Sequence, residues 1–128
     1  MDISLEDYQK LDPKCTVEFE GKKLIFQTPN LLTKYRADSL FTKEPGTIDW
    51  LNEISPKEIL LDIGANVGMY TIYAAIVRNA TVFALEPESQ NYSLLNKNIR
   101  LNELDHIVSA YCVGISDVDS FDYIFMGN

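Results

Sequence analysis

Several features are scarce in this sequence, and each scarcity narrows the possible functions. The 128 residues include two cysteines, Cys15 and Cys112, and one histidine, His106. Two cysteines so far apart do not form a disulfide framework, and the lack of any Cys/His grouping predicts no metal site. We expect a reducing compartment, a buried Cys112 within its apolar run, and a solvated His106 in a loop between a helix and a strand.

Long apolar runs and basic runs are also missing. The longest apolar stretch, Ile72–Val77, is far shorter than the roughly 20 residues that cross a bilayer. The N-terminus is acidic and polar, unlike a secretory signal. The net charge is −8, and the thin basic spots do not form the patch typical of nucleic-acid-binding surfaces. These observations favour a cytoplasmic protein with neither membrane nor nucleic-acid partners.

The first part of the chain predicts a hairpin followed by helices. Residues 1–14 are polar, and we expect them to be loose. Alternating residues in Thr16–Phe19 and Lys23–Gln27 flank a glycine turn and predict a β-hairpin. Residues 31–55 favour two helical pieces that are interrupted near Pro45-Gly46. We therefore expect residues 1–56 to form an N-terminal hairpin and helical segment.

The pattern changes at residue 57, where apolar runs alternate with helical periodicity. Strands are predicted at Ile59–Ile63, Thr81–Leu85 and Ile107–Val113, with helices between them, and Phe121–Met126 as a further strand. Helices between strands imply a parallel sheet and one βαβαβ half of a doubly wound, Rossmann-like α/β fold. Because the chain ends soon after the third strand, residues 57–128 are expected to form an incomplete half-domain.

A glycine turn between the first of these strands and the next helix carries the most specific signal. It runs Asp62-Ile63-Gly64-Ala65-Asn66-Val67-Gly68, which lacks the G-x-G-x-x-G of dinucleotide-binding proteins and the G-K-[ST] of a P-loop. Gly64 lets a ligand approach the backbone, and Gly68 permits close packing of helix and strand. Asp62 can face a cationic amino group, which S-adenosylmethionine has and nicotinamide dinucleotides lack.

A second acid, Glu86, follows the next strand 24 residues after Asp62. A carboxylate at this place can accept hydrogen bonds from both ribose hydroxyls of a nucleotide. Structural alternatives remain for both acids and for the turn. Asp62 could cap a helix or form an ion pair, Glu86 could be a solvated acid, and the glycine turn could bind nothing.

Taken together, these blocks resemble the FkbM family of class I methyltransferases. The shared elements are D-I-G-A-N-V-G at Asp62–Gly68, A-L-E-P at Ala84–Pro87, and N-Y-x-x-L-x-x-N-I at Asn91–Ile99. Ile115-Ser116-Asp117 and the upstream segment from Lys43 to Leu51 are also similar to the family pattern. The resemblance covers roughly residues 35–120.

The resemblance implies methyl transfer from S-adenosylmethionine to a hydroxyl of a sugar or other small metabolite. It implies that the loop of Asp62, Gly64, Asn66 and Gly68 surrounds the methionine end and that Glu86 holds the ribose. Ser116 or Asp117 would then lie near the adenine, while Ala65 and Pro87 complete the expected cofactor-binding set. No catalytic base can be named, and neither the acceptor nor the oligomeric state is indicated.

Two other functions remain open at this point. The chain could be a non-catalytic remnant or interaction module that keeps the cofactor-binding half-fold, or a nicotinamide-dependent dehydrogenase. Several further residues near the motif favour structural roles. Lys43, Glu44 and Asn91 are expected to be structural, and Tyr70 and Tyr73 are expected to belong to the core.

Overall fold

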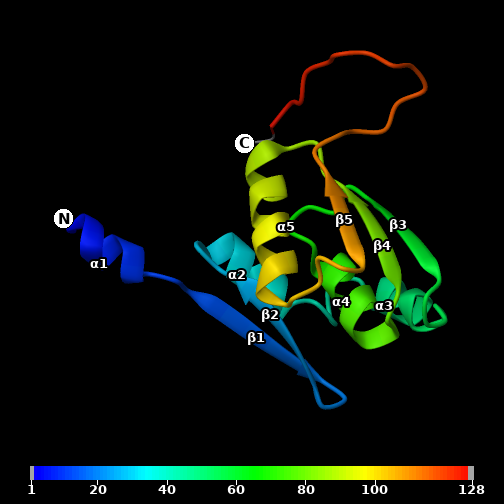
Figure 1. Cartoon of the computed structure of the whole chain (residues 1–128), viewed down its shortest axis with the longest axis horizontal. Helices are drawn as coiled ribbons and strands as arrows, with labels where there is room; N and C mark the ends of the chain where they lie inside the picture. The colour runs from blue at the N-terminus through cyan, green and yellow to red at the C-terminus, as the bar shows by residue number, and fades with distance from the viewer. Residues whose placement is uncertain (1, 127–128) are drawn as a thin grey trace.

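The computed structural model describes residues 2–126 and orders them into alternating helices and strands (Figure 1). The elements are α1 Leu5–Lys10, β1 Lys14–Phe19, β2 Lys22–Gln27, α2 Leu31–Asp38, α3 Pro45–Asn52, β3 Ile59–Ile63, α4 Met69–Arg78, β4 Thr81–Leu85, α5 Ser89–Leu101 and β5 Val108–Tyr111.

The strands β3, β4 and β5 form a parallel sheet in that order. Their register pairs Ile63 with Leu85 and Leu85 with Tyr111, so all three carboxyl ends meet at one edge. The connecting helices α4 and α5 both pack on the sheet. This arrangement confirms the predicted βαβαβ half of a Rossmann-like fold. It also brings the residues that follow β3, β4 and β5 close to one another.

The hairpin β1–β2 lies on α4 and α5, so these two helices are sandwiched between it and the parallel sheet (Figure 1). Two asparagines, one in α5 and one directly after it, hold the hairpin: Asn98 Oδ1 accepts from the Gln27 backbone amide at 2.8 Å, and Asn102 Oδ1 accepts from the Ile25 backbone amide at 2.9 Å. The Asn98 amide group also donates to the Val67 carbonyl at 2.8 Å. One fully buried side chain therefore ties the hairpin to the loop after β3.

The other face of the sheet is apolar and open among the described residues. Ile59, Leu61 and Ile63 alternate along β3 and are each more than half exposed. The buried core, by contrast, is one cluster that includes Leu24 and Phe26 of the hairpin and Ile72 and Val82 around the sheet. Residues 1–56 and 57–128 both contribute to this core. The division of the chain between these two segments stays a prediction.

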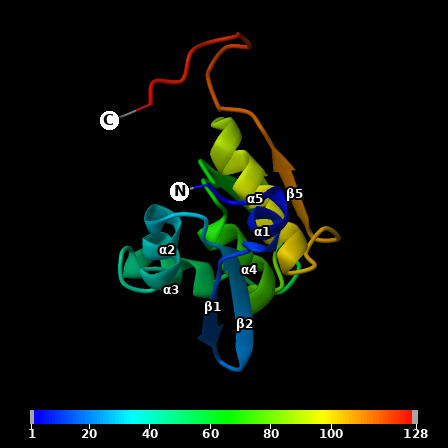
Figure 2. The same ribbon diagram turned by 90° about the vertical axis from the view of Figure 1, so that its left-hand side faces the viewer.

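Three expectations about local structure are wrong. Residues 5–10 form α1 rather than a loose segment, because the Ser4 side chain accepts from the Asp7 amide and caps the helix. Phe121–Met126 forms no strand, since no neighbouring strand pairs with it within residues 2–126; Figures 1 and 2 show an irregular segment beyond β5. Cys112 is exposed because it lies just past the end of β5.

His106 is exposed as expected. In residues 2–126, none of the helices combines the length and the apolar character that crossing a membrane requires.

Candidate cofactor site

The loop between β3 and α4 is a tight turn that three left-handed residues make possible. Gly64, Asn66 and Gly68 have φ values of +74°, +56° and +90°, a region that glycine and asparagine enter at low cost. The amides of Gly64 and Ala65 both donate to the Leu85 carbonyl, at 2.9 and 3.0 Å. The loop is thus fixed to the carboxyl end of β4 before any ligand binds.

Asp62, near the end of β3, is partly buried beside the first turn of α4. Its Oδ2 atom accepts a hydrogen bond from Thr71 Oγ1 at 2.5 Å. Burial raises the pKa of the Asp62 carboxyl above its usual 3.8, and the neighbouring Glu86 raises it further, while the Thr71 hydrogen bonds lower it. The sequence left open a structural contact between Asp62 and a helix, and the structure shows one, to Thr71 of α4. The carboxylate is suited to an ammonium group.

Glu86 lies directly after β4 and is buried, with 6% of its surface exposed. Its two oxygens accept from separate backbone amides: Oε2 from Asn66 at 2.7 Å and Oε1 from Glu88 at 2.9 Å. A carboxylate offers about four lone-pair positions, so each oxygen can still accept another donor. Glu86 is therefore not a freely solvated acid but a fixed acceptor that joins the loop after β3 to the entrance of α5.

A cleft of about 160 Å³ opens over this loop. Four of the residues that the sequence predicted to bind the cofactor line this cleft. Residues from α2, from the segment before α3 and from α4 line it as well. The lining comprises Arg36, Ser39, Leu40, Lys43, Glu44, Asp62, Gly64, Ala65, Asn66, Met69 and Tyr70. Tyr70 Oη donates to Glu44 Oε2 at 2.8 Å. Burial and this bond raise the pKa of Tyr70 to about 12, so its hydroxyl remains a donor at neutral pH.

The structure thus assigns different places to the predicted residues. Asp62, Gly64, Ala65 and Asn66 line the cleft, and Glu86 bonds to Asn66. Gly68 is buried at the start of α4, where an added Cβ would meet Leu95 of α5 at 2.6 Å. The close contact that Gly68 allows is therefore between two helices rather than between helix and strand.

Ser116 and Asp117 are not brought to this cleft. They are exposed in the segment after β5, where Ser116 Oγ bonds to Asp117 Oδ1 at 3.3 Å. Pro87 does not line the cleft either; it lies beside Gly114, where an added Cβ would be 3.6 Å from the Pro87 Cβ. An adenine role for Ser116 and Asp117 stays a prediction, as does a ligand role for Pro87.

Sequence reasoning missed Arg36, Lys43, Glu44 and Tyr70 as residues of the cleft. Tyr73 belongs to the core as expected, since it is fully buried. Tyr70 could have been found, because a residue in the first turn after the glycine loop lies near any ligand of that loop. Arg36 carries no local signal: its place depends on how α2 packs.

The residues at the cleft fit the amino-acid end of S-adenosylmethionine. Asn66 Oδ1 is a buried acceptor without a hydrogen-bond partner among the described residues, and such atoms are rare unless a ligand or water satisfies them. The space around Gly64 is open, since a Cβ there would meet nothing within 4 Å. An unsatisfied acceptor, a nearby carboxylate and an open glycine together suit a small group that carries an ammonium.

Comparison with known proteins decides the family. A model of the TRM5/TYW2 methyltransferase domain matches residues 43–128, about two thirds of the chain. The chain belongs to the TRM5/TYW2 methyltransferase domain family. A comparison with curated proteins gives no match.

Solved structures with the same fold agree with this family. TYW2 of P. horikoshii in complex with MeSAdo has 21% identity, a TM-score of 0.54, and covers 81% of this chain and 37% of its own. M. jannaschii TYW2 in complex with AdoMet has 19% identity and a TM-score of 0.54, with coverage of 78% and 43%. The M. jannaschii tRNA m1G37 methyltransferase has 22% identity and a TM-score of 0.51, with coverage of 83% and 32%.

These comparisons confirm the class I methyltransferase fold and S-adenosylmethionine as the cofactor. The chain spans 37% of the P. horikoshii TYW2 chain.

Two expectations are wrong. The chain is not of the FkbM family, because the family match is to TRM5/TYW2. The two most specific blocks of that resemblance, Asp62–Gly68 and Ala84–Pro87, lie at or beside the cofactor loop and are poor guides to the acceptor. The exclusion of nucleic acid is also wrong, since the matching family is the TRM5/TYW2 methyltransferase domain and a tRNA methyltransferase has the same fold. Net charge was a poor guide, because the chain spans only 32% of that methyltransferase and its charge does not describe the rest. A sugar or metabolite hydroxyl as acceptor finds no support.

Proposed function

We propose that this chain is the S-adenosylmethionine-binding part of a methyltransferase that modifies tRNA. The observation that carries the proposal is the TRM5/TYW2 domain match over residues 43–128. The cleft beside Asp62 and the loop bonded to Glu86 support it, since together they offer acceptors for an ammonium and a ribose. A cytoplasmic location remains a prediction.

The proposed roles follow from the geometry of the side chains. Asp62 binds the ammonium of the cofactor, Glu86 accepts from the ribose hydroxyls, and Gly64 lets the methionine end lie against the backbone. When bound, S-adenosylmethionine supplies an electrophilic methyl group. The chain holds that group in one place, and positioning two reactants supplies a large part of catalysis.

Contacts with tRNA are expected mainly outside this chain. Phosphate binding depends on Lys and Arg, and this chain has 11 of them against 19 acids. The related proteins are much longer than the matched portion. We therefore assign most of the tRNA contacts to the parts of such proteins that this chain does not span.

A transfer assay tests the proposed substrate. The protein is incubated with methyl-labelled S-adenosylmethionine and either unmodified tRNA or a mixture of sugars. Because most of the tRNA contacts are expected outside this chain, we expect slow but measurable labelling of the tRNA fraction and no labelling of the sugars. Label in the sugars alone would contradict the proposal, as would calorimetry that finds binding of NAD but none of S-adenosylhomocysteine.

Glu86 provides a test of the ribose contact. Glu86→Gln keeps one accepting oxygen but places an NH₂ group against one of the two backbone amides. We expect the affinity for S-adenosylhomocysteine to fall about tenfold, because one charge-assisted acceptor is lost. Isothermal titration calorimetry on the folded variant measures this change. The Gln variant is preferred to Glu86→Ala, which would leave both amides without their partner.

Glu88→Gln is the matched control, since Glu88 caps α5 by accepting from Gln90 and Asn91. It removes a charge at the same helix entrance without touching the loop. We expect unchanged affinity in this variant. An equal loss in both variants would show that general electrostatics, rather than a ribose contact, explains the effect.

A further inference from the structure

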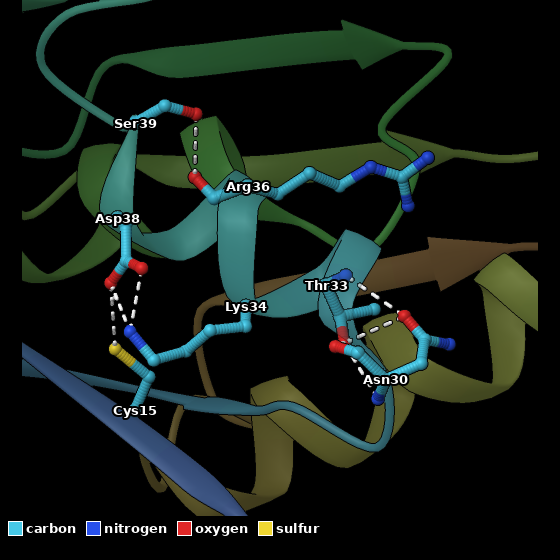
Figure 3. Close-up of polar contacts among 7 residues, drawn as sticks. All are labelled: Cys15, Asn30, Thr33, Lys34, Arg36, Asp38 and Ser39. Carbon is cyan, nitrogen blue, oxygen red and sulfur yellow. Dashed lines mark hydrogen bonds and ion pairs between the residues drawn. The ribbon is translucent and has the colours of Figure 1, made fainter.

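Arg36 is a cation of the cleft that the family match leaves without a role, because it lies outside residues 43–128. It belongs to α2 and is half-buried. Figure 3 shows its side chain extended away from Lys34 and Asp38, with the guanidinium ending beside a loop of the neighbouring α/β unit. The same cleft contains Asp62, Gly64 and Asn66.

Several charged groups around Arg36 have hydrogen-bond or ion-pair partners, whereas the Arg36 guanidinium has none among the described residues. Asp62 accepts from Thr71, and Glu44 accepts from Tyr70. Lys34 pairs with Asp38 at 2.5 Å on the outer side of α2. Among the residues that the structure describes, the Arg36 guanidinium has neither a hydrogen bond nor an ion pair within 4.0 Å; the bond at this residue uses its backbone carbonyl. A half-buried cation in this state favours an anionic ligand.

We propose that Arg36 binds the α-carboxylate of the amino-acid end of S-adenosylmethionine, opposite the ammonium site at Asp62. This inference rests on the proposed function and specifies how the site recognises its cofactor. A guanidinium binds a carboxylate through two parallel hydrogen bonds. A cleft with an acid and an unpaired arginine therefore complements a zwitterion, which carries one charge of each sign.

The size and charge of the cleft favour this ligand over an RNA phosphate. At about 160 Å³ it is smaller than the roughly 300–1,000 Å³ of sites that enclose whole ligands, but it suits one end of a molecule. Asp62 and Glu44 also line it, and these carboxylates would repel a phosphodiester that offers no compensating ammonium. Lys43 lies at the exposed margin of the cleft, where water competes with any partner.

Two ligands that differ in the amino-acid end test the proposal. S-adenosylhomocysteine has the carboxylate and the ammonium, and 5′-methylthioadenosine has neither. Calorimetry is performed with the full chain and its Arg36→Met and Arg36→Lys variants. We expect Arg36→Met to weaken the binding of S-adenosylhomocysteine about tenfold or more. The affinity for 5′-methylthioadenosine should stay within about twofold of the parent value. Arg36→Lys should lose less affinity than Arg36→Met, because lysine keeps the positive charge but cannot form the two parallel hydrogen bonds of a guanidinium.

Arg100→Met is the matched control, since Arg100 is exposed on α5, and it should bind both ligands as the parent does. Equal binding of S-adenosylhomocysteine by parent and Arg36→Met overturns the proposal, and so does an equal loss for both ligands, which indicates a structural role. Loss of tRNA binding alone would assign Arg36 to RNA phosphate instead. If the parent binds neither ligand, the proposed function itself fails and the Arg36 inference fails with it.

Discussion

Asp62→Asn is expected to weaken the binding of S-adenosylhomocysteine about a hundredfold. The same substitution is expected to make the unliganded protein more stable to heat. The affinity falls because an amide cannot form the charge-assisted bond with the ammonium, which is worth roughly 1.5–3 kcal/mol. The bond from Thr71 survives, since the amide oxygen of Asn can accept it. Calorimetry measures the affinity, and thermal unfolding of the unliganded protein measures the stability.

The gain in stability follows from the sign of the pKa shift. Burial raises the folded-state pKa of Asp62 above 3.8, so the protonated form is favoured in the folded chain. The corresponding stability is present at low pH and is lost as the pH rises through the folded pKa. At neutral pH the ionised side chain therefore destabilises the free protein, and a neutral Asn removes that effect.

The same shift predicts how cofactor binding depends on pH. The ammonium requires an ionised Asp62, so affinity should decline as the pH falls through the raised pKa of this carboxyl. The decline should begin at a higher pH than an ordinary aspartate would give, and it should be absent in Asp62→Asn. Asp105→Asn, at an exposed position before β5, is the control for a general change of charge. An unshifted profile, or Asn binding as tightly as Asp, would remove Asp62 from the ammonium site.

Sequence periodicity predicted the α/β unit because each of its elements has a local cause. The strands β3 and β4 are short apolar runs, and Gly64 and Gly68 lie where the chain takes positive φ. The hairpin was predicted for the same reason, with Glu20 and Gly21 in the left-handed region at its turn. For these elements, whose geometry is set by neighbours in sequence, the pattern was sufficient; α1 was missed although its Ser4 cap is also local.

Only some residues of the cleft were predicted from the sequence, because the position of the others depends on tertiary packing. Asp62 and Glu86 follow consecutive strands, and a parallel sheet brings strand ends together. Arg36 reaches the loop only because α2 packs on β1 while the hairpin lies on α4 and α5. Asn98 helps to fix the hairpin through its bonds with Gln27 and Val67. The acceptor class was missed for a related reason: the motif blocks describe cofactor contacts, which methyltransferases with different acceptors share.

Gly68→Ala is expected to destabilise the protein by about 2–5 kcal/mol. The residue has φ +90°, where an L side chain costs roughly 1–2 kcal/mol. Its Cβ would also stand 2.6 Å from Leu95 Cδ1, and Leu95 is fully buried, so the overlap adds roughly 1–3 kcal/mol. Urea unfolding followed by circular dichroism measures the change.

Gly64→Ala separates packing from binding, because Gly64 has a similar φ of +74° but open space around it. We expect a loss of only about 1–2 kcal/mol from strain, together with weaker cofactor binding, since the new methyl group lies on the cleft.

Leu95→Val identifies the contact itself. Shortening this side chain removes the atom that meets the new Cβ, so the double variant Gly68→Ala/Leu95→Val should be more stable than the sum of the two single losses predicts. Gly64→Ala should show no such coupling with Leu95→Val. Additive losses for Gly68 and Leu95 would mean that backbone strain alone requires glycine at the start of α4, and the contact with α5 would then be incidental.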